Sequence, residues 1–224
     1  DAVDLLQATG GKAFALPGDV TVQDDVDRIA ETVRTKYGGL DFLCNCVGQS
    51  TRLAILETTP EDFEHLWDVN FLTMVRMTRA FAPTLIECQG HLVNISSLAG
   101  KIATRYYGSY PATKYAVSAY SQQLRLELGP QGLHVLLVCP GPITRKEGAP
   151  RYQTPENLPA EASQPGGGAK ISSLDPDRLA EQILTACERR DPELIVPGKA
   201  RLLMALAALS PKLGDWLLKK MTSK

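Results

Sequence analysis

The chain has 224 residues, of which 44% are hydrophobic and 22% charged, and its net charge is -1. This length and balance are typical of one soluble globular domain and exclude collagen, a coiled coil or a disordered chain. The near-neutral charge without a basic run argues against nucleic acid as a partner. No stretch reaches about 18 unbroken apolar residues and no basic-then-apolar leader is present, so the sequence predicts neither a transmembrane span nor a signal peptide.

Cysteine and histidine usage favours a cytoplasmic protein without a metal site. Five cysteines form an odd count with no CxxC pair, which is typical of reduced, intracellular proteins. They are interpreted as small core residues: Cys44, Cys46, Cys88, Cys139 and Cys187. The three histidines, His65, His91 and His134, are scattered along the chain without the spacing of metal ligands, so no metal is expected.

The first half of the chain alternates between helix and strand patterns. A helix already under way at the first residue ends near residue 10, and residues 12–16 predict a strand that stops at a Pro-Gly-Asp turn. Apolar residues spaced by three and four then predict an amphipathic helix over 23–37, with Thr21 as its N-cap. The apolar run 40–47 predicts a strand buried on both faces.

The alternation continues to the end of the chain. Thr59 and Pro60 form a helix start, with the proline at the first helical position. The remaining predicted elements are helices over 60–88, 109–128 and 176–190 and strands over 91–97, 133–138 and 193–196. Strands that alternate with helices predict a parallel sheet covered by helices on both faces.

Two segments do not follow this pattern. Residues 143–174 are rich in Pro, Gly, Glu and Ser without periodicity, which is typical of a substrate lid inside a compact domain. Residues 200–220 carry an apolar stripe that something must cover. We consider three interpretations: a core or subunit contact, a cover over a substrate cleft, or peripheral contact of this C-terminal helix with a membrane surface through Lys212, Lys219 and Lys220.

Tyr110 and Lys114 lie one helical turn apart and share a face of the predicted helix. A tyrosine hydroxyl, whose free pKa is near 10, exchanges protons poorly at neutral pH. A nearby ammonium group stabilises the phenolate and lowers that pKa. By itself the spacing is more often that of a surface packing pair. Of the seven tyrosines, only Tyr110 has a lysine four residues on.

Other residues at the ends of the predicted strands accompany this pair. The motifs run from Gly18-Asp19-Val20 through Asn45-Cys46-Val47-Gly48, Asn70, Ser97 and Tyr110-Pro-Ala-Thr-Lys114 to Pro140-Gly141. Over essentially the whole chain, they resemble the short-chain dehydrogenase/reductase family. The resemblance implies an α/β fold with a doubly wound, Rossmann-like parallel sheet in three αβα layers, as one NAD(P)-binding domain over residues 1–224.

The resemblance also implies an activity, the transfer of hydride between a nicotinamide cofactor and a carbonyl or alcohol substrate. Tyr110 would be the proton donor or acceptor at the substrate oxygen, and Ser97 would steady that oxygen. Lys114 would lower the pKa of Tyr110 and hold the nicotinamide ribose. Asn70 would anchor a water molecule that links Lys114 to solvent.

The cofactor contacts that the resemblance implies, besides Tyr110 and Lys114, are Asp19, Val20, Asn45, Gly48, Pro140, Gly141, Ile143 and Thr144. Asp19 would contact the adenine ring, and the turn from Asn45 to Gly48 would let the cofactor approach the backbone. Cys46 and Val47 stand where the family more commonly has Asn-Ala. Thr144 falls one position early for the usual carboxamide contact.

The family's first strand, glycine-rich loop and second strand would precede Asp1, so we expect the natural protein to be longer and to supply this N-terminal βαβ portion. The residues that select NAD or NADP lie there, and NADP is the expectation from the family alone. The resemblance further implies a homodimer or homotetramer and a small-molecule carbonyl or alcohol substrate, which would be lipid-like or otherwise apolar if the C-terminal stripe closes over the cleft. The alternative function is that of a truncated, non-catalytic chain that acts as a protein-interaction module.

Overall fold

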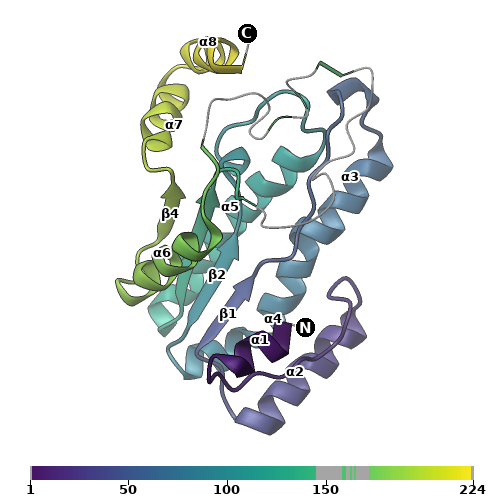
Figure 1. Cartoon of the computed structure of the whole chain (residues 1–224), viewed down its shortest axis with the longest axis vertical. Coiled ribbons are helices and arrows are strands. Elements are labelled where there is room, and N and C mark those ends of the chain that lie inside the picture. Colours follow the sequence, from purple (N-terminus) through teal and green to yellow (C-terminus); the bar gives the residue numbers. More distant parts are fainter. Residues whose placement is uncertain (1, 145–157, 160–161, 163, 165–171, 223–224) are drawn as a thin grey trace.

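The computed structural model describes residues 2–144, 158–159, 162, 164 and 172–222. Its centre is a four-stranded sheet in the order β1-β2-β3-β4, in which every neighbouring pair is parallel (Figure 1). The strands are β1 Phe42–Asn45, β2 His91–Ile95, β3 His134–Pro140 and β4 Glu193–Val196. Because parallel strands need a crossover between them, each connection carries at least one helix.

The helices are α1 Ala2–Ala8, α2 Gln23–Tyr37, α3 Pro60–Trp67, α4 Thr73–Glu87, α5 Tyr110–Leu128, α6 Pro176–Glu188, α7 Ala200–Leu209 and α8 Pro211–Thr222. A π-helical turn at Asp68–Leu72 joins α3 to α4. The predicted start of α3 is confirmed: Thr59 accepts a hydrogen bond from the Asp62 backbone, and the Asp62 carboxylate accepts one from the Thr59 backbone.

The two faces of the sheet carry different helices. On β2, Leu92 packs with Phe81 of α4 and Leu124 of α5, and α2 lies on the same side. The next residue, Val93, belongs to the opposite face and packs with Leu179 and Cys187 of α6. Successive strand residues point to opposite faces, so a run that is apolar throughout serves both. The Rossmann-like, three-layer αβα fold is thereby confirmed.

The pattern of elements agrees with the sequence, and the boundaries of α2 and β4 agree residue by residue. The predicted strand over residues 12–16 is wrong, since this segment has no regular structure. A strand needs a neighbour for its backbone N–H and C=O groups, and the described sheet has none beyond β1. Thr21 is not the N-cap of α2, which begins after Val22; Thr21 donates to the Asp19 carboxylate instead.

The interpretation of all five cysteines as core residues is also wrong. Cys139 on β3 and Cys187 on α6 are buried, whereas Cys44, Cys46 and Cys88 are exposed. Cys44 lies on β1, which is the edge strand of the described sheet. An edge strand has a neighbour on one side only, so an apolar pattern along it does not guarantee burial.

Candidate active site

The carboxyl ends of β1, β2 and β3 open into a cavity of about 880 Å³. In open parallel sheets, ligands bind beyond this edge of the strands. Strand ends and the start of α5 supply its polar wall, and α7 and α8 supply an apolar wall. The predicted site residues in this lining are Gly48, Ser97, Tyr110, Lys114, Pro140, Gly141 and Ile143.

Lys114 is the buried cation of the cavity, with only 4% of its surface exposed. Its Nζ donates a hydrogen bond to the Ile95 carbonyl oxygen at 3.0 Å and lies 5.9 Å from the centroid of the Tyr110 ring. Burial lowers the pKa of Lys114 to about 8, and negative charge on the nearby Cys46 and Cys139 sulfurs opposes this shift. The ammonium form is therefore the main form at neutral pH, although burial makes it easier to deprotonate than a surface lysine.

Tyr110 is the first residue of α5, and its backbone N–H donates to the Tyr107 carbonyl oxygen at 3.1 Å. The Tyr107 ring lies 6.0 Å from the Tyr110 ring, centroid to centroid. The guanidinium group of the buried Arg52 stacks on the Tyr107 ring, 3.8 Å from the ring centroid. Two packed layers therefore support one side of the tyrosine that the sequence singled out.

Ser97 is the second residue after β2, and its Oγ accepts a hydrogen bond from the Ala99 backbone N–H at 3.1 Å. The adjacent Ser96 Oγ donates to the Lys114 carbonyl oxygen at 3.0 Å and so ties the end of the strand to α5. This contact brings Ser97 to the same cavity as Tyr110 and Lys114, although the two parts are distant in the sequence.

Asn70 is fully buried in the π-helical turn. Its Oδ1 accepts from the Gln49 backbone N–H at 2.7 Å, and its Nδ2 donates to the Gln49 carbonyl oxygen at 2.9 Å and to Thr113 Oγ1 at 3.1 Å. The side chain therefore clamps the loop after β1 against α5, beside Lys114. The water relay that the family resemblance implies for Asn70 stays a prediction.

Other predicted contacts lie away from the cavity lining. Asn45 is buried at the end of β1, and its Nδ2 donates to Asn94 Oδ1 on β2 at 2.9 Å. Asp19 and Val20 form the turn before α2, and the hydrogen bonds from Thr21 lower the pKa of the exposed Asp19 carboxyl. The Thr144 backbone N–H donates to the Leu174 carbonyl oxygen at 2.8 Å. Their proposed contacts with a cofactor remain predictions. Most of the predicted lid lies outside the described residues.

The apolar wall of the cavity comes from the C-terminal stripe. The lining side chains of α7 and α8 are Leu202, Leu203, Met204, Leu206, Leu217, Leu218 and Met221. These contacts agree with the interpretation of the stripe as cover over a cleft. Met204 also packs toward the core beside Ile195, whereas Leu209 and Trp216 remain exposed. The apolar spacing predicted helices here, but nothing in it indicated which surface they would cover.

The residues present fit the nicotinamide end of a dinucleotide cofactor. A methyl group at Gly48 would lie 3.0 Å from Asn70 Oδ1 and 3.4 Å from Lys114 Nζ, so glycine keeps this corner of the cavity clear. The Lys114 ammonium group and the hydroxyls of Ser97 and Tyr110 line the same cavity as Pro140 and Gly141. Such a set can hold a ribose and orient a carbonyl oxygen.

Comparisons with known proteins identify the family. A family model described as short chain dehydrogenase matches residues 1–154. An uncharacterized oxidoreductase of Bacillus subtilis, YxnA, is 30% identical over 98% of this chain, and the chain spans 61% of that protein's length. A crystal structure of a short-chain dehydrogenase from Streptomyces avermitilis superposes with a TM-score of 0.80 at 29% identity, covering 99% of this chain and 84% of that one.

A second solved structure shares the fold at lower identity. The short-chain dehydrogenase/reductase from Burkholderia phymatum, solved in complex with NAD, superposes with a TM-score of 0.81 at 21% identity and covers 94% of this chain and 80% of that one. This chain belongs to the short-chain dehydrogenase family. Among the described residues, every helix is too short or too polar to cross a bilayer.

Proposed function

We propose that the protein is an NAD(P)-dependent oxidoreductase that interconverts an apolar carbonyl compound and its alcohol, with Tyr110 as the acid/base group. The observation that carries this proposal is one cavity bounded by Ser97, Tyr110 and Lys114 on one side and by the leucines of α7 and α8 on the other. The solved relatives include proteins in complex with NAD and with NADPH. NADP is the proposed cofactor.

The bound nicotinamide would supply or accept the hydride. In the reduction direction, the Tyr110 hydroxyl donates its proton to the carbonyl oxygen as negative charge develops there. The Ser97 hydroxyl donates a hydrogen bond to the same oxygen and stabilises this charge. The Lys114 ammonium group stabilises the resulting Tyr110 phenolate, and it would also hold the nicotinamide ribose. Asn70 keeps the loop at Gly48 in place beside Lys114.

A chain-length series of aldehydes tests the activity and the apolar substrate together. Butanal, hexanal and octanal are each assayed by the loss of NADPH or NADH absorbance. We expect NADPH to support turnover, and kcat/KM to rise about fourfold for each added methylene, which corresponds to about 0.8 kcal/mol of apolar burial. If no aldehyde oxidised either nucleotide, the proposed activity would be contradicted.

A matched pair of variants assigns the effect to the cavity wall. Leu206→Asn replaces a lining side chain with an amide and is expected to flatten the dependence on chain length. Leu209→Asn makes the same change on the same helix at a side chain that is 84% exposed and outside the lining, and it should leave the dependence intact. Equal slopes for the two variants would contradict the role of α7.

The activity should also depend on the charge of Lys114. Below about pH 8 the lysine is protonated and available to Tyr110 and the ribose, whereas above it the charge is lost. We therefore expect kcat/KM for reduction to be level near pH 7 and to fall about tenfold per pH unit well above 8. A pH profile with the cofactor at fixed concentration measures this limb.

Cys46 provides a control for this assignment. Its thiol pKa is lowered, first by a hydrogen bond from Cys44 and also by the charge of Lys114, and its own negative charge raises the pKa of the lysine. Cys46→Ala should therefore move the alkaline limb to lower pH, while Cys88→Ala, far from Lys114, should not. A limb that stayed in place in Cys46→Ala would assign it to another group.

A further inference from the structure

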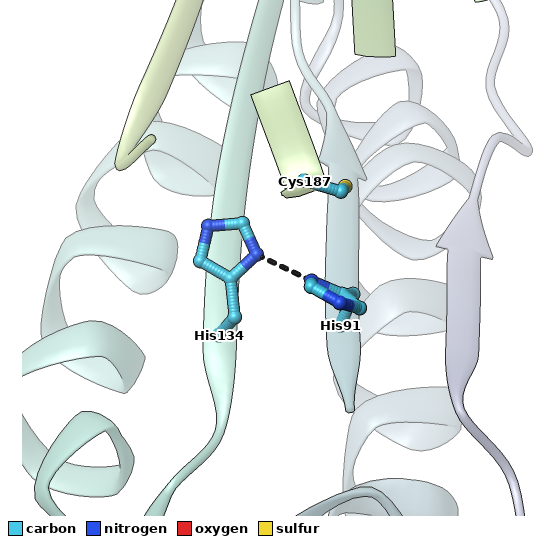
Figure 2. A group of neighbouring side chains, drawn as sticks. All are labelled: His91, His134 and Cys187. Carbon is cyan, nitrogen blue, oxygen red and sulfur yellow. Dashed lines mark hydrogen bonds between the residues drawn. The ribbon is translucent and has the colours of Figure 1, made fainter. Parts of the chain in front are cut away.

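Two histidines and a cysteine meet near the amino ends of β2 and β3, whereas the cavity lies at the carboxyl ends of the strands. His91 is the first residue of β2 and His134 is the first residue of β3, and the two are Cα partners in the parallel register. Cys187 reaches them from the last turn of α6, which covers this face (Figure 2). One nitrogen of each imidazole and the Cys187 sulfur all lie within 4.8 Å of one another.

The hydrogen bonds of the two imidazoles define which nitrogens face each other. His134 Nε2 lies 2.9 Å from the Asp191 carbonyl oxygen, which can only accept, so this nitrogen carries the proton. His134 Nδ1 therefore has no proton, and its lone pair accepts a hydrogen bond from the N–H of His91 Nδ1 at 2.8 Å. This contact is the dashed line in Figure 2. A backbone carbonyl that holds one imidazole nitrogen and leaves the other free is the usual outer partner of a metal-bound histidine.

The environment favours the metal-binding form of the two imidazoles, whereas burial raises the pKa of the Cys187 thiol to about 11, so this thiol keeps its proton until an ion displaces it. His134 and Cys187 are buried and His91 is partly exposed, so an ion can enter past His91. Burial, more than the nearby Arg190 charge, lowers the pKa of His91, and burial is also the main cause of the lowered pKa of His134. A lowered pKa favours the neutral form of both imidazoles. The Arg190 side chain donates hydrogen bonds to the Gln89 and Gly132 carbonyl oxygens. Its charge lowers the pKa of both histidines, whereas the charge of Asp41 raises that of His91 and the charge of Asp191 raises that of His134.

We propose that His91, His134 and Cys187 form a zinc site, in which both Nδ1 atoms and the Cys187 thiolate bind Zn²⁺ and water takes the fourth position. Two imidazoles and one thiolate suit this borderline-soft ion. Zinc bond lengths and tetrahedral angles require about 3.3 Å between the nitrogens and about 3.6 Å from each to the sulfur. The two nitrogens, now 2.8 Å apart, must separate by roughly 0.5 Å, and the sulfur, which lies within 4.8 Å of both, must settle at the zinc distance.

Zinc binding has a defined proton balance. The Cys187 thiol loses its proton to solvent when the Zn–S bond forms. His91 Nδ1 exchanges its proton for the metal, and the imidazole takes a proton on Nε2, so it stays neutral. One proton is therefore released for each zinc ion bound, without oxidation or reduction.

The site would act as a structural clamp rather than in hydride transfer. A zinc ion there ties the end of α6 to β2 and β3. His91 is four residues from Ile95, whose carbonyl accepts from Lys114, and four strand residues span about 13 Å. Zinc should therefore raise the thermal stability of the protein, while kcat/KM per folded molecule stays the same.

The test begins with protein freed of metal by a chelator and then titrated with ZnCl₂ alone, and in parallel with CoCl₂ as a spectroscopic probe. We expect one ion per chain, one proton released per zinc ion, a higher Tm, and the ligand-field bands and thiolate charge-transfer band of tetrahedral Co²⁺. Cys187→Ser, which is nearly isosteric, should lose the charge-transfer band and at least about 100-fold in zinc affinity. His91→Gln provides a second ligand deletion at a partly exposed position.

Cys88→Ala is the matched control, because it removes an exposed thiol that is not a member of the cluster, and this variant should bind zinc as the parent does. The proposal is overturned if the parent shows no 1:1 binding at micromolar zinc. It is equally overturned if Cys187→Ser and His91→Gln bind zinc as tightly as the parent, since the ion would then be held elsewhere.

Discussion

Tyr110→Phe is expected to lower kcat by about 10²- to 10⁴-fold, the range for loss of a positioned general acid or base. The substitution removes only the hydroxyl, so the packing of the ring against Tyr107 and the burial of Lys114 are retained. The affinity for NADPH should therefore be nearly unchanged. Steady-state kinetics and a fluorescence titration with NADPH measure the two quantities separately.

The matched control for this variant is Tyr115→Phe on the same helix. Its hydroxyl donates to the Lys101 carbonyl oxygen at 2.7 Å and lies outside the cavity lining, so its removal should leave turnover close to that of the parent. Comparable turnover in Tyr110→Phe and the parent would remove Tyr110 from the mechanism. A large loss of NADPH affinity in Tyr110→Phe would assign it a binding role instead.

Gly100→Ala is expected to lower the free energy of unfolding by about 1–3 kcal/mol, the usual cost of forcing an extra carbon into a packed site. A Cβ at this position would lie 2.4 Å from Ser96 Oγ and 2.5 Å from the Lys114 carbonyl oxygen. The second contact is with helix backbone, which cannot rotate away as a flexible side chain could. The turn after Ser97 would have to separate from α5.

Urea denaturation measures this change, with Gly129→Ala as the control. Nothing lies within 4 Å of a Cβ at Gly129, and its φ of -56° suits alanine, so the control should be neutral or slightly stabilising. Because the clash also displaces Ser97 from Lys114, Gly100→Ala should lose activity even below its unfolding transition. If the urea midpoint of Gly100→Ala equalled that of Gly129→Ala, the turn after Ser97 would accommodate the added methyl group without loss of stability.

Much of the fold and part of the site follow from local features of the sequence. Apolar periodicity and the glycines after Tyr37 predicted the bounds of α2, because the hydrogen bonds of a helix join residues close in the chain. The Tyr110–Lys114 pair was accessible for the same reason, since helical geometry alone brings residues four apart onto one face. Ser97 and Gly48 followed from their positions at strand ends, which parallel strands bring to one edge.

The sequence did not predict where individual side chains point or what each surface covers. Asn45 and Cys46 are adjacent in one motif, yet Asn45, the last residue of β1, donates to Asn94, whereas Cys46 lines the cavity. Residues 12–16 have a strand pattern but no partner strand beside β1 in the described sheet. Strand formation depends on a neighbour, which a local pattern cannot specify.

What the sequence by itself determined is therefore the order and type of most elements, the family, and the lysine paired with Tyr110. Only the tertiary structure decided that α7 and α8 wall the cavity, and that His91 meets His134 and Cys187. The expectation that the histidines form no metal-ligand set rested on their spacing in the chain. Register between parallel strands brings residues 91 and 134 together irrespective of that spacing, because strand pairing depends on hydrogen bonds across the sheet rather than along the chain.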